Sequence, residues 1–410
     1  MKALPLLAPL WAAVAFAVRA GSTEPAQVVT ERGPFHNIVE THSATIDSNG
    51  TTRVETNSYV HLEVGLNRKD KIGHWAASTD QIELLDGGAV ARGGQHQVTF
   101  APNLTDEWPI DLIGPDGQTL RSRALGLGYF DAASGKSVII AEVKDSKGFL
   151  LGRNQIIYFD AFDDVSADVR YTDTIGGFEQ DVLLREAPPA PESFGLSSET
   201  SRLEILTEFA ETSAPAIKIN WQRPSHNSGA PNMALPSFVD EELNFGEMTF
   251  IEGKAFSLLN NADKKMAVAK SWQRLGDRAF LIEAVELHSI ADNLSALPRA
   301  VVSSERWARR LVKSGRAAPP IRKPNPRSDK ITYLAGNKEL AARLDSSAYV
   351  VDFIVTPTSP TNYTFRADTT YLINGPINLN TTPNNSITFE GGTVIKFAPG
   401  VGAGLNVNGP

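Results

Sequence analysis

The chain has 410 residues, of which 41% are hydrophobic and 21% charged, and its formal net charge at pH 7 is −8. Together with 32 glycines and 25 prolines, this composition is typical of a turn-rich globular protein of two or three domains and excludes a disordered chain. The absence of cysteine excludes disulfides, lipid-modified cysteines and the usual zinc clusters.

Residues 1–20 have the order of a secretory signal peptide. Lys2 precedes an apolar run from Ala3 to Val18, and a polar stretch begins after Ala20. The apolar run is shorter than the ~20 residues of a membrane-spanning helix, and no later stretch approaches that length. We therefore predict cleavage after Ala20, a mature chain that begins at Gly21, and no integral membrane span after cleavage.

Residues 21–186 are predicted to form a β-sandwich-like domain. Val60, Leu62, Val64 and Leu66 occupy alternate positions, which is the period of a strand with one buried face. Comparable runs, separated by turn-forming clusters, cover residues 81–85, 96–100, 137–143 and 149–159. Many short strands joined by Gly- and Pro-containing turns favour a sandwich.

A second β-rich domain is predicted over residues 187–300, after the Pro-rich break at Ala187–Pro191. Its expected strands lie at residues 202–209, 216–221, 248–250, 266–272 and 278–285. Gly276 and Asp277 between the last two of these strands indicate a hairpin. Helix is expected only at residues 290–297 and 338–344.

Residues 301–347 are predicted to be a basic, Pro-rich linker. Residues 301–330 include nine Lys or Arg residues, four prolines and only two acidic residues, Glu305 and Asp329. A basic run of this kind can bind nucleic acid. Because Trp307 is its only aromatic residue and it lies between exported domains, we expect no nucleic-acid partner.

Short apolar pairs recur at a regular spacing after residue 348. Residues two apart in a strand share a face, and four such pairs are separated by turn formers: Ile377/Leu379, Ile387/Phe389, Ile395/Phe397 and Leu405/Val407. Two-residue faces cannot bury themselves, so units of this kind become stable by stacking on copies of themselves. We predict an incomplete parallel β-helix over residues 348–410, with a small antiparallel meander as the alternative.

The phrase GGTVIKF, followed by a Gly-rich turn and LNVNG, resembles the opening coils of the right-handed parallel β-helices of secreted bacterial proteins, the solenoid of the pectate lyases. This resemblance covers residues 369–410 and implies that any catalytic residues lie in later coils. More loosely, through the phrases GFEQDV, FGEM and KSW, the chain is similar to large exported bacterial proteins with a β-rich front, a linker and a β-helix. The chain is therefore expected to be the front part of a longer protein.

The sequence identifies no catalytic residue. Its seven histidines show no paired metal-binding spacing, and no phosphate-binding loop or nucleophile elbow is present. Carboxylate neighbours such as Asp106/Glu107 and Glu241/Glu242 point in different directions on a strand. The only metal candidate is a calcium site at Asp160, Asp163, Asp164 and Asp168, for which a solvated strand end is the alternative. No other cofactor is expected.

Two classes of function remain open. The first is an exported protein of the cell surface, the extracellular space or the periplasm, with a structural or binding role and with polysaccharide or cell-envelope components as partners. The second is a carbohydrate-active enzyme, a polysaccharide lyase or hydrolase, whose active site lies in β-helix coils beyond residue 410. A polysaccharide-cleaving groove would need clustered acidic and basic side chains on successive coils.

Overall fold

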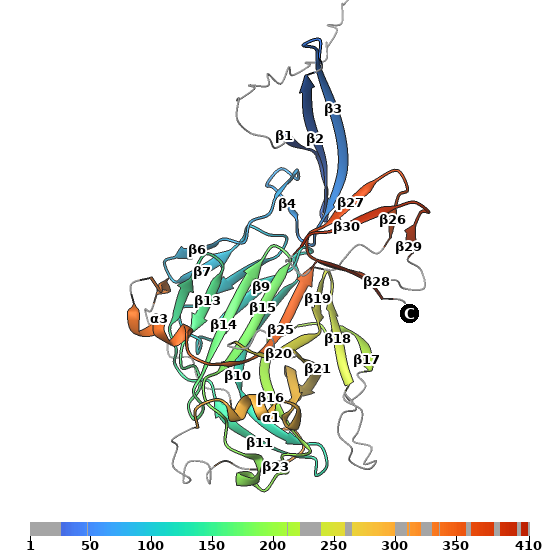
Figure 1. Ribbon diagram of the computed structural model, residues 1–410. Coiled ribbons are helices and arrows are strands. Elements are labelled where there is room, and N and C mark those ends of the chain that lie inside the picture. Colours follow the sequence, from blue (N-terminus) through green and yellow to red (C-terminus); the bar gives the residue numbers. More distant parts are fainter. Residues whose placement is uncertain are drawn as a thin grey trace, which may run out of the picture.

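The computed structural model describes residues 26–46, 48–210, 212–221, 239–258, 265–299, 310, 312–320, 330–335, 337–357, 362–380, 386–399 and 403–408. The predicted signal peptide and its cleavage site lie outside these ranges. The described chain is mainly β, and most of its strands form a nearly closed, barrel-like sheet with two walls (Figure 1). The mainly β class predicted from the sequence is confirmed.

The first wall is antiparallel throughout. In spatial order it contains β6 (Ile82–Leu85), β7 (Gly88–Ala91), β8 (Gln97–Phe100), β9 (Ile110–Ile113), β10 (Thr119–Asp131), β16 (Ser201–Phe209), β22 (Arg278–Glu286) and β21 (Met266–Leu275). Beside β9, the strand β10 also pairs with β11 (Lys136–Glu142), whose outer edge carries β23 (Lys313–Ser314).

The second wall is centred on β15 and β25. In order it contains β24 (Thr332–Tyr333), β12 (Gly148–Leu151), β13 (Gln155–Tyr158), β14 (Ala167–Thr174), β15 (Gly177–Leu184) and β25 (Tyr349–Pro357). Two strands, β19 (Met248–Ile251) and β20 (Gly253–Ser257), share the far edge of β25. β19 also pairs with β18 (Val239–Phe245), which in turn pairs with β17 (Ala216–Trp221). Pairing of β20 with β21 joins the two walls.

The main hydrophobic core lies between these walls, because each strand turns its alternate apolar residues inward. In it, the rings of Tyr171 and Phe178 stack at a centroid distance of 5.6 Å. Gln180 of β15 donates from Nε2 to the hydroxyl of Thr207 on β16 at 3.1 Å, which connects the walls across the core. The interior is therefore filled by side chains and includes a few polar ones.

The predicted boundary at residue 187 lies inside this sheet system. After it, the 3-10 helix η1 (Pro191–Phe194) leads into β16, which pairs with β10 from the front segment and with β22 from the second segment. The main core likewise contains residues from both segments. The described strands of residues 21–186 and 187–300 thus find partners in each other, which differs from the two separate sandwiches that we expected.

The described part of the predicted linker packs against the barrel-like sheet. Arg310 forms ion pairs with Glu142 at 3.1 Å, with Asp163 at 3.0 Å and with Asp164. Further on, β23 and β24 add to the two walls, and Ile331 is buried in the main core. This departs from the free linker that the prolines and charges indicated, because the basic side chains have acidic partners distant in sequence.

Both predicted helices are present. α1 (Leu287–Ser295) follows β22, and α3 (Lys338–Leu344) begins after Asn337, whose side chain accepts a hydrogen bond from the backbone N–H of Leu340 at 3.1 Å. Neither helix is long or apolar enough to cross a membrane, and no other helix in the described residues has that length and character.

An arm projects from the barrel-like sheet (Figure 1). It consists of β1 (Ala26–Arg32), β2 (His36–Ile46) and β3 (Thr52–Leu62), paired antiparallel in that order. The small hairpin of β4 (Asn67–Lys69) and β5 (Trp75–Ala77) follows. Ile46 and Val54, toward the end of the arm, are exposed, whereas Leu62 at its base is buried.

The strands after residue 362 form a parallel stack. β26 (Tyr363–Phe365), β27 (Thr370–Ile373) and β28 (Pro376–Asn380) pair in parallel with β29 (Ile387–Phe389), β30 (Val394–Phe397) and β31 (Gly404–Asn408), in that order. We call β26–β31 the strand stack. On its other edge β27 pairs in parallel with β3, so the sheet β1-β2-β3-β27-β30 contains both arm and stack.

The parallel pairing excludes the antiparallel meander for these strands, and Ile377 and Leu379 lie opposite Leu405 and Val407. Two details of the sequence interpretation need correction. The predicted β-helix segment 348–410 begins too early, because β25 is a central strand of the second wall. The apolar spacing also missed β26 and β27, the first two strands of the stack.

Candidate functional site

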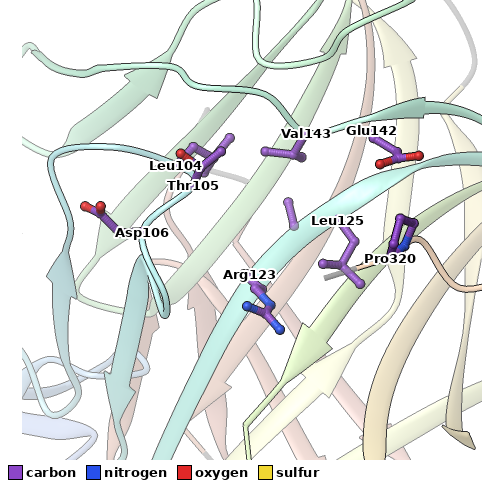
Figure 2. Close-up of a pocket in the computed structure, with 9 residues that line it drawn as sticks. Leu104, Thr105, Asp106, Arg123, Leu125, Glu142, Val143 and Pro320 are labelled. Carbon is purple, nitrogen blue, oxygen red and sulfur yellow. The ribbon is translucent and has the colours of Figure 1, made fainter. Parts of the chain in front are cut away.

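A small hollow with a volume of about 40 Å³ opens among the loop after β8, the strand β10, the end of β11 and Pro320, which follows β23 in the chain (Figure 2). Apolar side chains form much of its lining: Leu104, Ala124, Leu125, Val143 and Pro320. Thr105, Asp106, Arg123 and Glu142 add polar groups. A mostly apolar lining with a few polar groups is common at small-molecule binding sites, but such sites usually measure about 300–1,000 Å³, so this hollow has room for only a small group of a ligand.

Arg123 is fixed in place by contacts with Glu208, with Trp108 and with the backbone carbonyl of Glu107. Its Nε donates to Oε2 of Glu208 at 2.8 Å, and its guanidinium lies 4.6 Å from the centre of the Trp108 ring. Glu208 is buried and also accepts a hydrogen bond from Nε of Arg278 at 2.6 Å. An arginine held by a buried carboxylate and an indole face presents its remaining donors in a defined direction.

The acidic groups lie at opposite ends of the hollow, with Leu125 and Val143 between them (Figure 2). Asp106 accepts a hydrogen bond from the backbone N–H of Asn103 at 3.2 Å, and Glu142 pairs with Arg310. The hydroxyl of Thr105 donates to Asp145 at 2.6 Å. No histidine or cysteine is among the described residues that line the hollow.

The four calcium candidates are each paired with a basic side chain. Asp160 accepts from Nζ of Lys144 at 2.6 Å, while Asp163 and Asp164 both pair with Arg310. Asp168 is fully buried and accepts from Nε of Arg185 and from Nε of Arg343, both at 2.8 Å. A calcium ion would have to displace these side chains. Over the described ranges, no group of three or more histidine and acidic residues is arranged to hold a metal.

The other acidic pairs singled out in the sequence serve strand contacts. Glu241 accepts from the backbone N–H of Trp272 at 2.6 Å, and Glu242 lies 4.0 Å from Nζ of Lys218. Sequence reasoning missed the buried pair of His96 and Asp173, whose Nε2 and Oδ1 are 2.9 Å apart. His96 immediately precedes β8 and Asp173 lies on β14, and no local motif connects them.

Comparison with known proteins identifies no relative of this chain. No family model matches the chain, and neither the curated proteins nor the solved structures contain a significant match. The function is therefore argued from the site and the architecture.

Proposed function

We propose that the chain is an exported, non-catalytic protein of the cell surface or extracellular space with a structural or binding role. The observation that carries this proposal is the parallel pairing of β3 with β27, which makes the projecting arm and the strand stack parts of one sheet. Such a sheet is suited to presenting a surface at a distance from the barrel-like body. The signal-peptide pattern of residues 1–20 supports export.

We further propose that the strand stack is the start of a right-handed parallel β-helix. Three strands repeat in the same order with their apolar pairs aligned, which supports a solenoid. Parallel crossover connections are right-handed in about 98% of cases, which supports the hand. We also interpret the two walls joined by β20 and β21 as a distorted sandwich.

The hollow beside Arg123 is the proposed binding site, with polysaccharide or another cell-envelope component as its ligand. Arg123 and the two carboxylates at the ends are partly exposed and suit the hydroxyl groups of a sugar, whereas Leu125 and Val143 are buried. Since these polar groups already have partners within the protein, the site is better suited to binding than to bond cleavage.

Affinity electrophoresis against a panel of soluble polysaccharides, with product analysis of the same mixtures, tests this function. We expect retardation by at least one polysaccharide and no release of new reducing ends or unsaturated products. Arg123→Ala, with its fold checked by circular dichroism, should abolish the retardation, whereas Arg121→Ala, outside the hollow on the same strand, should preserve it. Absence of retardation throughout the panel would contradict the polysaccharide assignment.

A carbohydrate-active enzyme is the second candidate, favoured by one observation: Asp106 and Glu142 lie across one hollow (Figure 2). Two carboxyl groups roughly 5–10 Å apart across a cleft are what glycoside cleavage requires. If the polysaccharide mixtures do show cleavage, Asp106→Asn and Glu142→Gln should each abolish it. Cleavage that disappears in both variants would replace the binding proposal by the enzymatic one.

Export is tested separately by sequencing the N-terminus of protein recovered outside the cytoplasm of an expressing bacterium. The proposal predicts Gly21 as the first residue. An intact Met1 form retained in the membrane would contradict it.

A further inference from the structure

A lysine and an aspartate meet in the interior of the barrel-like sheet. Nζ of Lys270 on β21 donates to Oδ1 of Asp240 on β18 at 2.7 Å, and the backbone N–H of Lys270 donates to the same oxygen at 2.9 Å. The two side chains are 0% and 2% exposed. Removing an ammonium and a carboxylate from water in this way is costly, so the pair needs an explanation beyond a surface ion pair.

Glu283 lies beside this pair. It is the direct register partner of Lys270 in the β21–β22 ladder and is buried. Among the described residues, neither of its carboxyl oxygens has a hydrogen-bond partner. Burial raises the pKa of Glu283 well above its usual value, and the nearby Asp352 adds to this effect while Lys270 opposes it. Burial therefore favours the neutral form of the Glu283 carboxyl, which can donate a proton, and the Glu283 oxygens have no competing hydrogen-bond partner among the described residues.

We propose that Lys270 and Asp240 become joined by an intramolecular amide bond, with Glu283 transferring protons between the reacting groups. The inference depends on these three residues and on neither export nor polysaccharide binding. Only a small movement of the two side chains is needed for the bond to form, because Nζ already lies 2.7 Å from an oxygen of the carboxyl group.

The chemistry is a condensation. A proton passes from the ammonium of Lys270 to the carboxylate of Asp240 through their hydrogen bond, which gives a neutral amine and a neutral acid. The amine lone pair then attacks Cγ of Asp240, the Nζ–Cγ bond forms, one Cγ–O bond breaks, and one water molecule leaves. Glu283 gives a proton to the departing oxygen and takes one from the nitrogen, so it ends unchanged. No oxidant or reductant is needed.

The surroundings favour this step. Lys270 lies between Val268 and Trp272 on β21, and Trp272 packs against Phe209 and Phe245 at 5.3 Å between ring centroids. Apolar surroundings favour neutral over charged groups, which promotes the amine nucleophile, and they keep water from reversing the reaction.

The bond would also have a structural consequence. In the described residues, β18 pairs with β17 and β19, and β21 pairs with β20 and β22, so no backbone ladder joins β18 to β21. A covalent link there closes the second wall onto the first. In a chain without cysteine, it supplies the cross-link that a disulfide cannot.

Mass spectrometry of the purified full chain tests the proposal. We expect an intact mass lower by one water molecule than the sequence predicts. Trypsin should yield a branched peptide of residues 219–254 and 266–274, because an amidated Lys270 is not cleaved. A free 266–270 peptide together with the full calculated mass would overturn the proposal.

Four variants separate the roles, each with its fold checked by circular dichroism. Lys270→Arg keeps the charge but has no primary amine, so the full calculated mass is expected. Asp240→Asn should lose ammonia instead of water. Glu283→Gln should leave bond formation incomplete, and complete bonding in it would remove Glu283 from the proposal. Lys218→Arg, at an exposed lysine beside Glu242, is the control and should retain the mass deficit.

Discussion

The rings of Phe365 and Phe389 stack with centroids 4.6 Å apart and planes inclined by 5°. The two residues are register partners in the parallel pair β26–β29, so the same side chain stacks at the same position of both strands. Phe365 is fully buried, whereas Phe389 is 46% exposed. The strands β26–β28 are therefore packed more tightly than the outer row of the stack, which consists of β29–β31.

Truncation of the two rings should have unequal effects. Phe365→Ala removes a buried ring between the arm base and the outer row and should destabilise the stack by about 3–5 kcal/mol. Phe389→Ala should cost roughly a third of that, since its ring is half exposed. Amide hydrogen exchange of residues 363–379 in both variants measures this difference. Equal acceleration in the two variants would contradict the described packing.

The stability of the barrel-like sheet should fall as the pH rises from about 4 to about 7. Burial raises the pKa of Asp352 from 3.8 to about 7, and Asp181 and Glu179 reinforce the shift although the backbone N–H of Lys254 opposes it. A carboxyl whose pKa is higher in the folded state stabilises the fold below its unfolded pKa, and this contribution disappears as the pH passes the folded pKa. The effect should be of the order of a few kcal/mol.

Asp352→Asn tests this dependence, because asparagine keeps an acceptor for the N–H of Lys254 and cannot ionise. Urea unfolding at pH 5 and pH 8 should show a smaller decrease in free energy for the variant than for the natural chain. Asp292→Asn, on the exposed side of α1, should leave the decrease unchanged. An identical pH dependence in all three proteins would contradict the assignment.

Arg310 should control access to the segment that follows it. Its loss in Arg310→Gln leaves Glu142, Asp163 and Asp164 without their shared cation, at a cost of about 1–3 kcal/mol. Trypsin is expected to cut the natural chain first within residues 301–330 and to cut after Lys313 faster in the variant. Arg92→Gln, in the exposed pair with Glu83, serves as the control. First cleavage within residues 30–290 would argue against both statements.

Two arginines on β10 should differ in their contribution to stability. Arg123 pairs with the buried Glu208, whereas the side chain of Arg121 is 55% exposed and pairs with Asp111. Chemical denaturation should show a loss of about 1–3 kcal/mol for Arg123→Ala and less than about 1 kcal/mol for Arg121→Ala. Similar losses would show that the contact of Arg123 with Glu208 contributes no more to stability than the exposed pair of Arg121 with Asp111.

Local features could be predicted from the sequence. The hairpin between β21 and β22 was expected from Gly276 and Asp277, and the structure pairs Leu275 with Arg278 around them. Gly276 has a φ of +62°, which glycine adopts without strain. The extent of α3 was predicted to the residue, because Asn337 provides a cap and the following residues favour helix. These signals act within a few residues.

Partners distant in sequence could not be predicted. Alternating apolar residues show which face of β3 is buried, but they do not indicate that its edge pairs with β27, more than three hundred residues later. The number of basic residues in 301–330 predicted a free basic segment. The acidic partners of Arg310 could not be foreseen, because they come from β11 and from the loop before β14. The pairing of Lys270 with Asp240 likewise depends on tertiary packing and has no sequence motif.

Hydrogen exchange of the full chain, resolved to single segments, most directly tests whether the arm base and the strand stack form one sheet. We predict slow exchange at Val60–Leu62 and at Tyr371–Ile373, which pair in parallel and are largely buried, and fast exchange toward the end of the arm at residues 43–55. Exchange at residues 371–373 as fast as at residues 43–55 would contradict the shared sheet and, with it, the proposed role of the chain as a scaffold that presents arm and stack together.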